Sequence, residues 1–226
     1  MLGYRTPEPR CGHRGCWDGW AEPIATVPNA ITTVRTLVSL ALTLTGAATG
    51  STSLLVVGLV VYVVGDSADG VSARLLRQET RRGALYDIVT DRFCSLGFWV
   101  PWAVVHPDVR LPIALYAVEF VLVDGPLSLL WAKWPLTSCN YVGRVDRWVW
   151  VLNWCVPAKT VNSTALILLI VVRPMPVVAT ALVATILVVK AASLVRLRSL
   201  LPAPPPGCAV RPGTSVRRFA SVASAP

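Results

Sequence analysis

The chain has 226 residues, of which 54% are hydrophobic and only 15% charged, and its mean hydropathy is +0.59. A soluble domain carries about 25% charged residues, and a soluble fold of this size cannot bury so much apolar surface. The composition therefore excludes a soluble enzyme, a disordered protein and a nucleic-acid-binding module, and predicts a protein whose solvent is lipid. The net charge of +9 suits anionic lipid headgroups, because basic residues lie between the apolar runs.

Six apolar stretches are each long enough to cross a bilayer as an α-helix, which takes about 20 residues. They cover 31–49, 53–76, 83–105, 111–132, 148–172 and 175–195. We therefore predict an all-α integral membrane protein with six transmembrane helices. Before this membrane domain, which covers 28–200, we expect a flexible N-terminus over 1–27 with a short interfacial helix near 17–27. After it we expect a disordered, basic tail rich in Pro, Ala and Ser over 201–226.

Basic residues lie almost entirely on one side of these six stretches. They occur in the N-terminal segment, in the second and fourth links and in the tail, whereas the opposite side carries only Arg110 and Arg173. The positive-inside rule then places both termini in the cytoplasm. Arg outnumbers Lys 18 to 3, which is typical of a GC-rich genome. We expect a protein of the bacterial cell (inner) membrane, with its active site facing the cytoplasm.

Four of the twelve acidic residues fall within the second and third stretches: Asp66, Asp69, Asp87 and Asp91. A charge inside a membrane costs several kcal/mol unless it is paired or hydrated. Pairing with the nearby Arg74 or Arg92 still leaves net negative charge, which divalent cations would balance. Oxygen-only ligands favour Mg²⁺ or Mn²⁺, and two such ions suit a diphosphate substrate.

The spacing of these acidic residues predicts that they form one cluster. The first two are three residues apart and the last two are four apart, so each pair lies on one face of its helix. The polar link over 77–82 folds the two helices into an antiparallel hairpin, which lets the two acidic faces converge. Gly70, Ala73 and Gly83 are small and leave room for a ligand to approach the backbone.

The same residues resemble the signature of the CDP-alcohol phosphotransferase family. The matching pattern is Asp66-x2-Asp69-Gly70-x2-Ala73-Arg74-x8-Gly83-x3-Asp87-x3-Asp91. The segment 28–35, Pro-Asn-Ala-Ile-Thr-x2-Arg, resembles the family's opening of the first helix. The resemblance covers 28–200. It implies a membrane enzyme that moves a phosphatidyl group from CDP-diacylglycerol to a small alcohol and releases CMP.

The resemblance also implies a role for each matched position. The four aspartates would hold two metal ions, and Asp91 would also take the proton from the acceptor hydroxyl. The CDP-lipid site would be lined by Asn29, Thr32, Gly70, Ala73, Arg74, Thr80 and Gly83. The implied partners are CDP-diacylglycerol, a small phosphorylated alcohol and membrane lipids, and we expect a homodimer that binds no nucleic acid.

The acceptor alcohol is less closely defined by the sequence. The segment 78–84 resembles the phosphatidylglycerophosphate synthase and cardiolipin synthase branches, which favours glycerol 3-phosphate. Arg92, directly after the last aspartate, is typical of members that use an inositol phosphate, so an inositol phosphate stays open as the acceptor. Phosphatidylglycerol stays open as well. An acceptor phosphate needs cations. The basic link between the fourth and fifth helices and the start of the latter offer Arg144, Arg147 and Lys159.

Two other classes of protein share part of this pattern. Intramembrane prenyltransferases also bind magnesium diphosphates through Asp-rich helices, but their two acidic motifs lie in separate halves of a longer chain. A cation transporter could use an acidic cluster as its pore, but has no reason to keep small residues at these spacings. The hairpin arrangement of the motif therefore favours the phosphotransferase.

A separate Cys/His motif lies near the N-terminus. Cys11, His13 and Cys16 offer three metal ligands within six residues. Structural zinc sites take four ligands, usually in more closely spaced pairs. The sequence alone therefore favours no metal site here.

Overall fold

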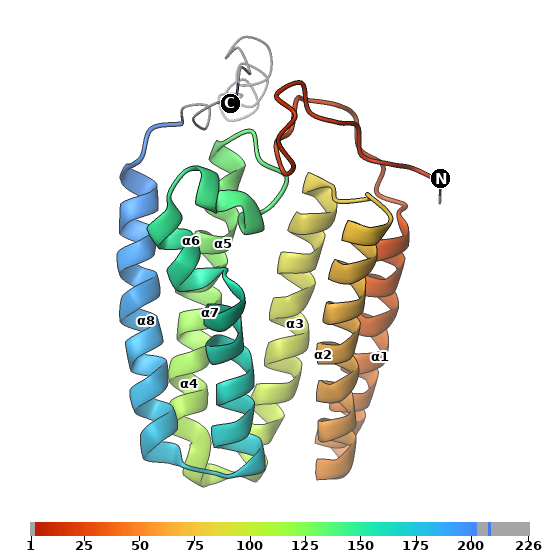
Figure 1. Cartoon of the computed structure of the whole chain (residues 1–226). Helices are drawn as coiled ribbons and strands as arrows, with labels where there is room; N and C mark the ends of the chain where they lie inside the picture. Colours follow the sequence, from red (N-terminus) through yellow and green to blue (C-terminus); the bar gives the residue numbers. More distant parts are fainter. Residues whose placement is uncertain (1–2, 203–207, 209–226) are drawn as a thin grey trace, which may run out of the picture.

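The computed structural model describes residues 3–202 and 208 of the chain. Six helices that are long and apolar enough to cross a membrane pack side by side along one direction (Figure 1). They span Val27–Thr49, Thr52–Leu75, Arg81–Val105, Pro107–Lys133, Arg147–Val172 and Pro176–Ser199. The predicted all-α membrane fold is confirmed, and each predicted helix end lies within four residues of the observed one.

The first three spans are single continuous helices. They are α1 (Val27–Thr49), α2 (Thr52–Leu75) and α3 (Arg81–Val105). Each begins with a hydroxyl side chain that accepts a backbone N–H three residues ahead: Thr26 from Asn29, Ser51 from Leu54 and Thr80 from Gly83. Such N-caps satisfy N–H groups that have no partner within the helix.

Glycines allow α1 and α2 to approach closely. A Cβ atom at Gly58 would lie 2.6 Å from Cγ2 of Thr43, and the hydroxyl of Ser39 donates a 2.9 Å hydrogen bond to the Gly58 carbonyl. About two helical turns further along α2, a Cβ atom at Gly65 would lie 2.5 Å from Cβ of Arg35. This contact places the Arg35 side chain directly beside the acidic residues of α2.

The fourth span changes its helical type along its length. A 3₁₀ turn over Pro107–Val109 leads into α4 (Arg110–Val118), followed by a π-helical stretch over Glu119–Asp124. Then come α5 (Gly125–Leu129) and a final 3₁₀ turn over Leu130–Lys133. Pro126, near the start of α5, has no N–H to donate and so cannot continue the preceding hydrogen-bond pattern.

The fifth span is interrupted, although the sequence predicts one helix over 148–172. The short α6 (Arg147–Asn153) is capped by Trp154, and α7 (Val156–Thr160) begins after a break. Two π-helical turns follow, over Val161–Ala165 and Leu168–Val172. Pro157 explains the break, because it removes the N–H that would bond to the carbonyl four residues earlier. The last span is the continuous α8 (Pro176–Ser199).

The segment before α1 has no helix, so the interfacial helix expected near 17–27 is not formed. Gly19 adopts a left-handed conformation (φ 84°), and Glu22 instead accepts the Arg81 and Arg82 backbone N–H groups at the start of α3, at 2.8 and 3.2 Å. Burial raises the pKa of the Glu22 carboxyl. The segment is thus tied across one end of the bundle. The predicted disordered tail lies outside the described residues, except for 201, 202 and 208.

The start of α1 and the end of α8 lie at the same end of the bundle, together with the links 76–80 and 134–146 (Figure 1). The structure therefore sorts the loops into two sets, and the basic residues predict which set is cytoplasmic.

Reporter fusions test this orientation. Fusions after Gln78 and Tyr141 are expected to report a cytoplasmic position, and fusions after Thr49 and Pro107 the opposite side, because cytoplasmic loops retain Arg and Lys. Paired enzymatic and fluorescent reporters at the four positions provide the measurement. An external signal after Gln78 would contradict the orientation.

Candidate active site

Carboxylates from two neighbouring helices converge inside the bundle. Asp66 and Asp69 come from α2, and Asp87 comes from α3; one carboxylate oxygen from each lies within 4.8 Å of the others. Asp91, one helical turn further along α3, belongs to the same group through a shared partner, Arg35. The two helices run as the two arms of a hairpin, which brings their acidic faces together.

Arg35 of α1 is the centre of this acidic cluster. Its side chain is 2% exposed, and its Nε lies 2.8 Å from Oδ2 of Asp69. Its Nη2 lies 2.9 Å from Oδ1 of Asp91 and 3.4 Å from Oδ1 of Asp66, and it also bonds to Asp87. One guanidinium thus contacts all four carboxylates.

Two other arginines lie close to the aspartates in the sequence and were predicted as their partners. In the structure Arg74 is exposed on α2, and Arg92 pairs with Asp124 of the fourth span. Arg35 has a signal in the sequence, since it ends the 28–35 motif. Its contact with all four carboxylates depends on how α1 crosses α2, which no local pattern reveals.

The charge of this cluster fits a site for divalent cations. Four carboxylates and one guanidinium carry a formal charge of −3 when all are ionised. Such an excess inside a membrane is costly unless cations balance it. The donors are all carboxylate oxygens, which hard cations prefer, and the Thr32 hydroxyl donates a 2.7 Å hydrogen bond to Oδ2 of Asp69 that orients this carboxylate.

A small cavity of about 90 Å³ opens on one side of Asp69 and Asp87. It is lined by every residue that the sequence analysis assigned to a CDP-lipid site: Asn29, Thr32, Gly70, Ala73, Arg74, Thr80 and Gly83. A Cβ atom at Gly83 would lie 2.8 Å from both Oδ1 of Asn29 and Oγ1 of Thr80. Only glycine therefore leaves this wall of the small cavity in place.

Two segments that the sequence analysis did not connect close over the small cavity. Glu79, which lines it, accepts a 2.9 Å hydrogen bond from the Tyr141 hydroxyl and pairs at 3.2 Å with Arg14. Burial and the charge of Glu79 raise the pKa of Tyr141 to about 12, so this side chain stays a neutral donor. The loop before α1 and the link between the fourth and fifth spans are thereby joined above the site.

A larger cavity of about 380 Å³ is lined by all four aspartates and shares Asp69 and Asp87 with the small one. Among the candidate acceptor-binding cations, Lys159 lines this larger cavity, and its Nζ donates a 2.7 Å hydrogen bond to Oδ1 of Asn140. Arg144 and Arg147 lie in the preceding link and at the start of α6, and neither is among the described residues that line the two cavities.

A second buried charge network borders the larger cavity. Nζ of Lys190 on α8 lies 2.8 Å from Oε1 of Glu119 and 2.9 Å from Oδ1 of Asp124, which also pairs with Arg92. Residues five apart point about 140° apart in an α-helix, whereas a π turn brings them close to one face. The π stretch Glu119–Asp124 therefore lets both of its acidic ends reach the same lysine. Two cations balance two anions, so this network carries no net charge.

A bundle apolar enough for a membrane, with two cavities that share Asp69 and Asp87, is the architecture of an integral membrane protein with an internal binding site. The family model for CDP-alcohol phosphatidyltransferase matches residues 25–195, and the chain belongs to this family. Searches of the curated proteins and of the solved structures each give no match. As a member of the family, the protein is a transferase of phospholipid biosynthesis that acts on a CDP-alcohol, and the family uses divalent metal ions.

Substitution of Arg35 tests the charge balance of the acidic cluster. Arg35→Gln is expected to lower the melting temperature in chelator by several degrees, since removing one partner of a buried ion pair costs about 3–5 kcal/mol. Millimolar Mg²⁺ should restore much of this loss, because cations then balance the carboxylates.

Thermal unfolding in detergent, with and without Mg²⁺, provides the measurement for Arg35→Gln. Arg110→Gln is the matched control, because Arg110 is exposed at the opposite end and its Nε donates to the backbone carbonyl of Ala103. Equal melting temperatures of the Arg35 variant and the native chain in chelator would contradict the central role of Arg35.

Proposed function

We propose that the protein transfers the phosphatidyl group of CDP-diacylglycerol to a small phosphorylated alcohol, with glycerol 3-phosphate as the preferred acceptor. The observation that carries this proposal is the meeting of two cavities at Asp69 and Asp87. The small cavity is lined by the positions that the resemblance assigns to the CDP-lipid, and the larger cavity by all four aspartates and Lys159. Two substrates in the two cavities could thus reach the same carboxylates.

We assign the nucleotide to the small cavity because of the residues that line it. Gly70 and Gly83 open its walls, and the guanidinium of Arg74 folds back along α2 to within 3.5 Å of where a Cβ atom at Gly70 would lie. Arg74 lines both cavities, so its charge is available to a diphosphate that extends from one to the other. The lipid tails of the donor would remain in the bilayer.

The residues of the acidic cluster suit an in-line phosphoryl transfer. The acceptor oxygen bonds to the phosphorus that carries the diacylglycerol, the bond from that phosphorus to CMP breaks, and CMP leaves with its electron pair. Asp91 accepts the proton of the acceptor hydroxyl, and Arg35 holds its carboxylate in place. Two Mg²⁺ or Mn²⁺ ions bound by Asp66, Asp69, Asp87 and Asp91 would neutralise the charge of the diphosphate.

Lys159 is our candidate for the acceptor phosphate. It is exposed, lines the larger cavity, and is hydrogen-bonded to the neutral amide of Asn140. By contrast, Arg92 and Lys190, which line the same cavity, are engaged by acidic partners. We place the site at the cytoplasmic face of a bacterial inner membrane, where a soluble phosphorylated alcohol is available, and expect the enzyme to work as a homodimer.

The four aspartates provide the test of the chemistry. Asp91→Asn is expected to lower kcat by about 10²- to 10⁴-fold, the usual contribution of a general base, while CDP-diacylglycerol binding changes little. Asp69→Asn should weaken the response of activity to Mg²⁺ concentration as well, because a charged ligand is lost. CMP release by purified, monodisperse variants provides the measurement, and full activity of either variant or of the native enzyme in excess chelator would refute the site.

The acceptor is identified with a panel of alcohols and the variant Lys159→Ala. Glycerol 3-phosphate is expected to support the fastest CMP release, with phosphatidylglycerol and an inositol phosphate as the alternatives that the panel distinguishes. Lys159→Ala should raise the KM for the acceptor about tenfold or more with little change in the KM for CDP-diacylglycerol, because it removes a phosphate contact in one cavity.

Arg198→Ala is the matched control for Lys159→Ala. Arg198 is exposed near the end of α8, at the same face of the bundle, and is not among the described residues that line either cavity. A shared, salt-sensitive loss in both variants indicates headgroup binding instead. An unchanged acceptor KM in the Lys159 variant places the acceptor phosphate elsewhere.

A further inference from the structure

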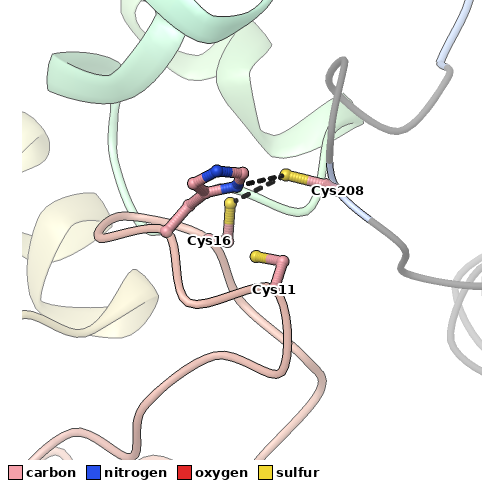
Figure 2. A group of neighbouring side chains, drawn as sticks. Cys11, Cys16 and Cys208 are labelled. Atoms are coloured by element: carbon pink, nitrogen blue, oxygen red, sulfur yellow. Dashed lines mark hydrogen bonds between the residues drawn. The ribbon is translucent and has the colours of Figure 1, made fainter.

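Three cysteines and a histidine from the two ends of the chain form one cluster at the end of the bundle where α1 begins. Cys11, His13 and Cys16 belong to the loop before α1, and Cys208 follows α8 (Figure 2). One ligand atom from each of the four lies within 4.8 Å of the others. Sγ of Cys208 is 3.2 Å from Sγ of Cys16 and 3.5 Å from Nδ1 of His13.

The structure supplies the fourth ligand that the N-terminal motif lacks. Zinc in structural sites is held by four Cys or His ligands in a tetrahedron, with Zn–S bonds of about 2.3 Å, which places neighbouring ligand atoms about 3.8 Å apart. Two of the observed separations, 3.2 and 3.5 Å, are slightly shorter than this value, and no two of the four ligand atoms are more than 4.8 Å apart. A ligand set of three sulfurs and one nitrogen suits zinc rather than the hard cations that carboxylates bind.

We propose that Cys11, His13, Cys16 and Cys208 bind one structural Zn²⁺ ion that fastens the segment after α8 to the loop before α1. The three thiols release their protons to solvent when the ion binds, and His13 binds as the neutral ring. The site is closed, because four protein ligands leave no position for a substrate.

The turns of the loop favour this arrangement of ligands. Gly12 and Gly15 adopt left-handed conformations (φ 67° and 86°), and the N–H of Cys16 bonds to the carbonyl of His13 at 3.2 Å. These turns direct the three ligands of the loop to one point. Gly15 is also required by its neighbour, since a Cβ atom there would lie 2.2 Å from the Tyr141 ring.

The same loop is attached to the membrane domain. The N–H of Trp17 bonds to the carbonyl of Pro135 at 3.0 Å, and the N–H of Thr137 bonds to the carbonyl of Gly15 at 2.9 Å. Arg14, between two residues of the motif, pairs with Glu79 above the small cavity. The ion would therefore fix the loop that closes over the small cavity, which gives the cluster a structural role.

A disulfide between Cys16 and Cys208 is the competing explanation of their proximity. Such a disulfide would involve only two of the four residues and would not explain why Cys11 and His13 lie beside them. The cluster also lies at the end of the bundle that we expect to face the reducing cytoplasm, where disulfides are rare and metal sites are the usual use of clustered cysteines. All six cysteines are free thiols in the structure.

Metal analysis of the purified full chain tests the site. After expression in zinc-supplemented medium and purification without chelator, mass spectrometry is expected to find about one zinc ion per chain, and X-ray absorption should show three sulfurs at about 2.3 Å and one nitrogen. Zinc-free protein, an iron-loaded site, a zinc shell of oxygen ligands, or an intact mass that reveals a Cys16–Cys208 disulfide in the native enzyme would each overturn the proposal.

Two ligand variants and one matched control locate the ion. Cys11→Ser and Cys208→Ser should each lower the zinc content roughly tenfold, and Cys155→Ser should retain it, because Cys155 lies in the fifth span and bonds to the carbonyl of Val151. Retained zinc in both ligand variants overturns the site. If a variant fails to fold, the absorption spectrum of the native protein still decides, and none of these readouts depends on transferase activity.

Discussion

The contact between the buried Arg35 side chain and four carboxylates is the interaction on which the rest of the structure depends. One guanidinium cannot balance four negative charges, and in a membrane the remaining charge must be met by cations from outside the fold. Cations bound beside these carboxylates would therefore stabilise the cluster. A buried ion pair of this kind contributes little net stability, but it holds the carboxylates in one place and so keeps the binding site formed.

The packing of the first three helices follows from this contact. Arg35 reaches the cluster because glycines in α2 let α1 approach to van der Waals distance, and Gly83 keeps the small cavity open beside Asn29. The fourth and fifth spans carry π turns and proline breaks. One of these, Glu119–Asp124, aligns two carboxylates on Lys190 and so lines the larger cavity with a neutralised wall. The first three helices hold the carboxylates and Arg35, and residues of the later spans line the larger cavity beside them.

The sequence predicted those features that depend on local periodicity. Six spans could be located because each needs about 20 apolar residues, and the acidic cluster because spacings of three and four share a helix face. The break before α7 was not predicted, although Pro157 signals it. The interfacial helix near 17–27 was predicted but not formed, because Glu22 binds the start of α3 instead. The central position of Arg35 and the pairing of Lys190 with Glu119 depend on helix crossings, which no local pattern encodes.

The Cys/His cluster shows the same limit at the scale of the whole chain. Its N-terminal half offers three ligands, and the sequence gives no reason to choose Cys208, 192 residues beyond Cys16, as the fourth. All four ligands lie outside residues 25–195, which match the family. The chemistry assigned to the family is therefore complete without them. Two contacts join their loop to the small cavity: Arg14 pairs with Glu79, and the N–H of Thr137 bonds to the carbonyl of Gly15. A zinc ion there would make the shape of that cavity depend on both ends of the chain.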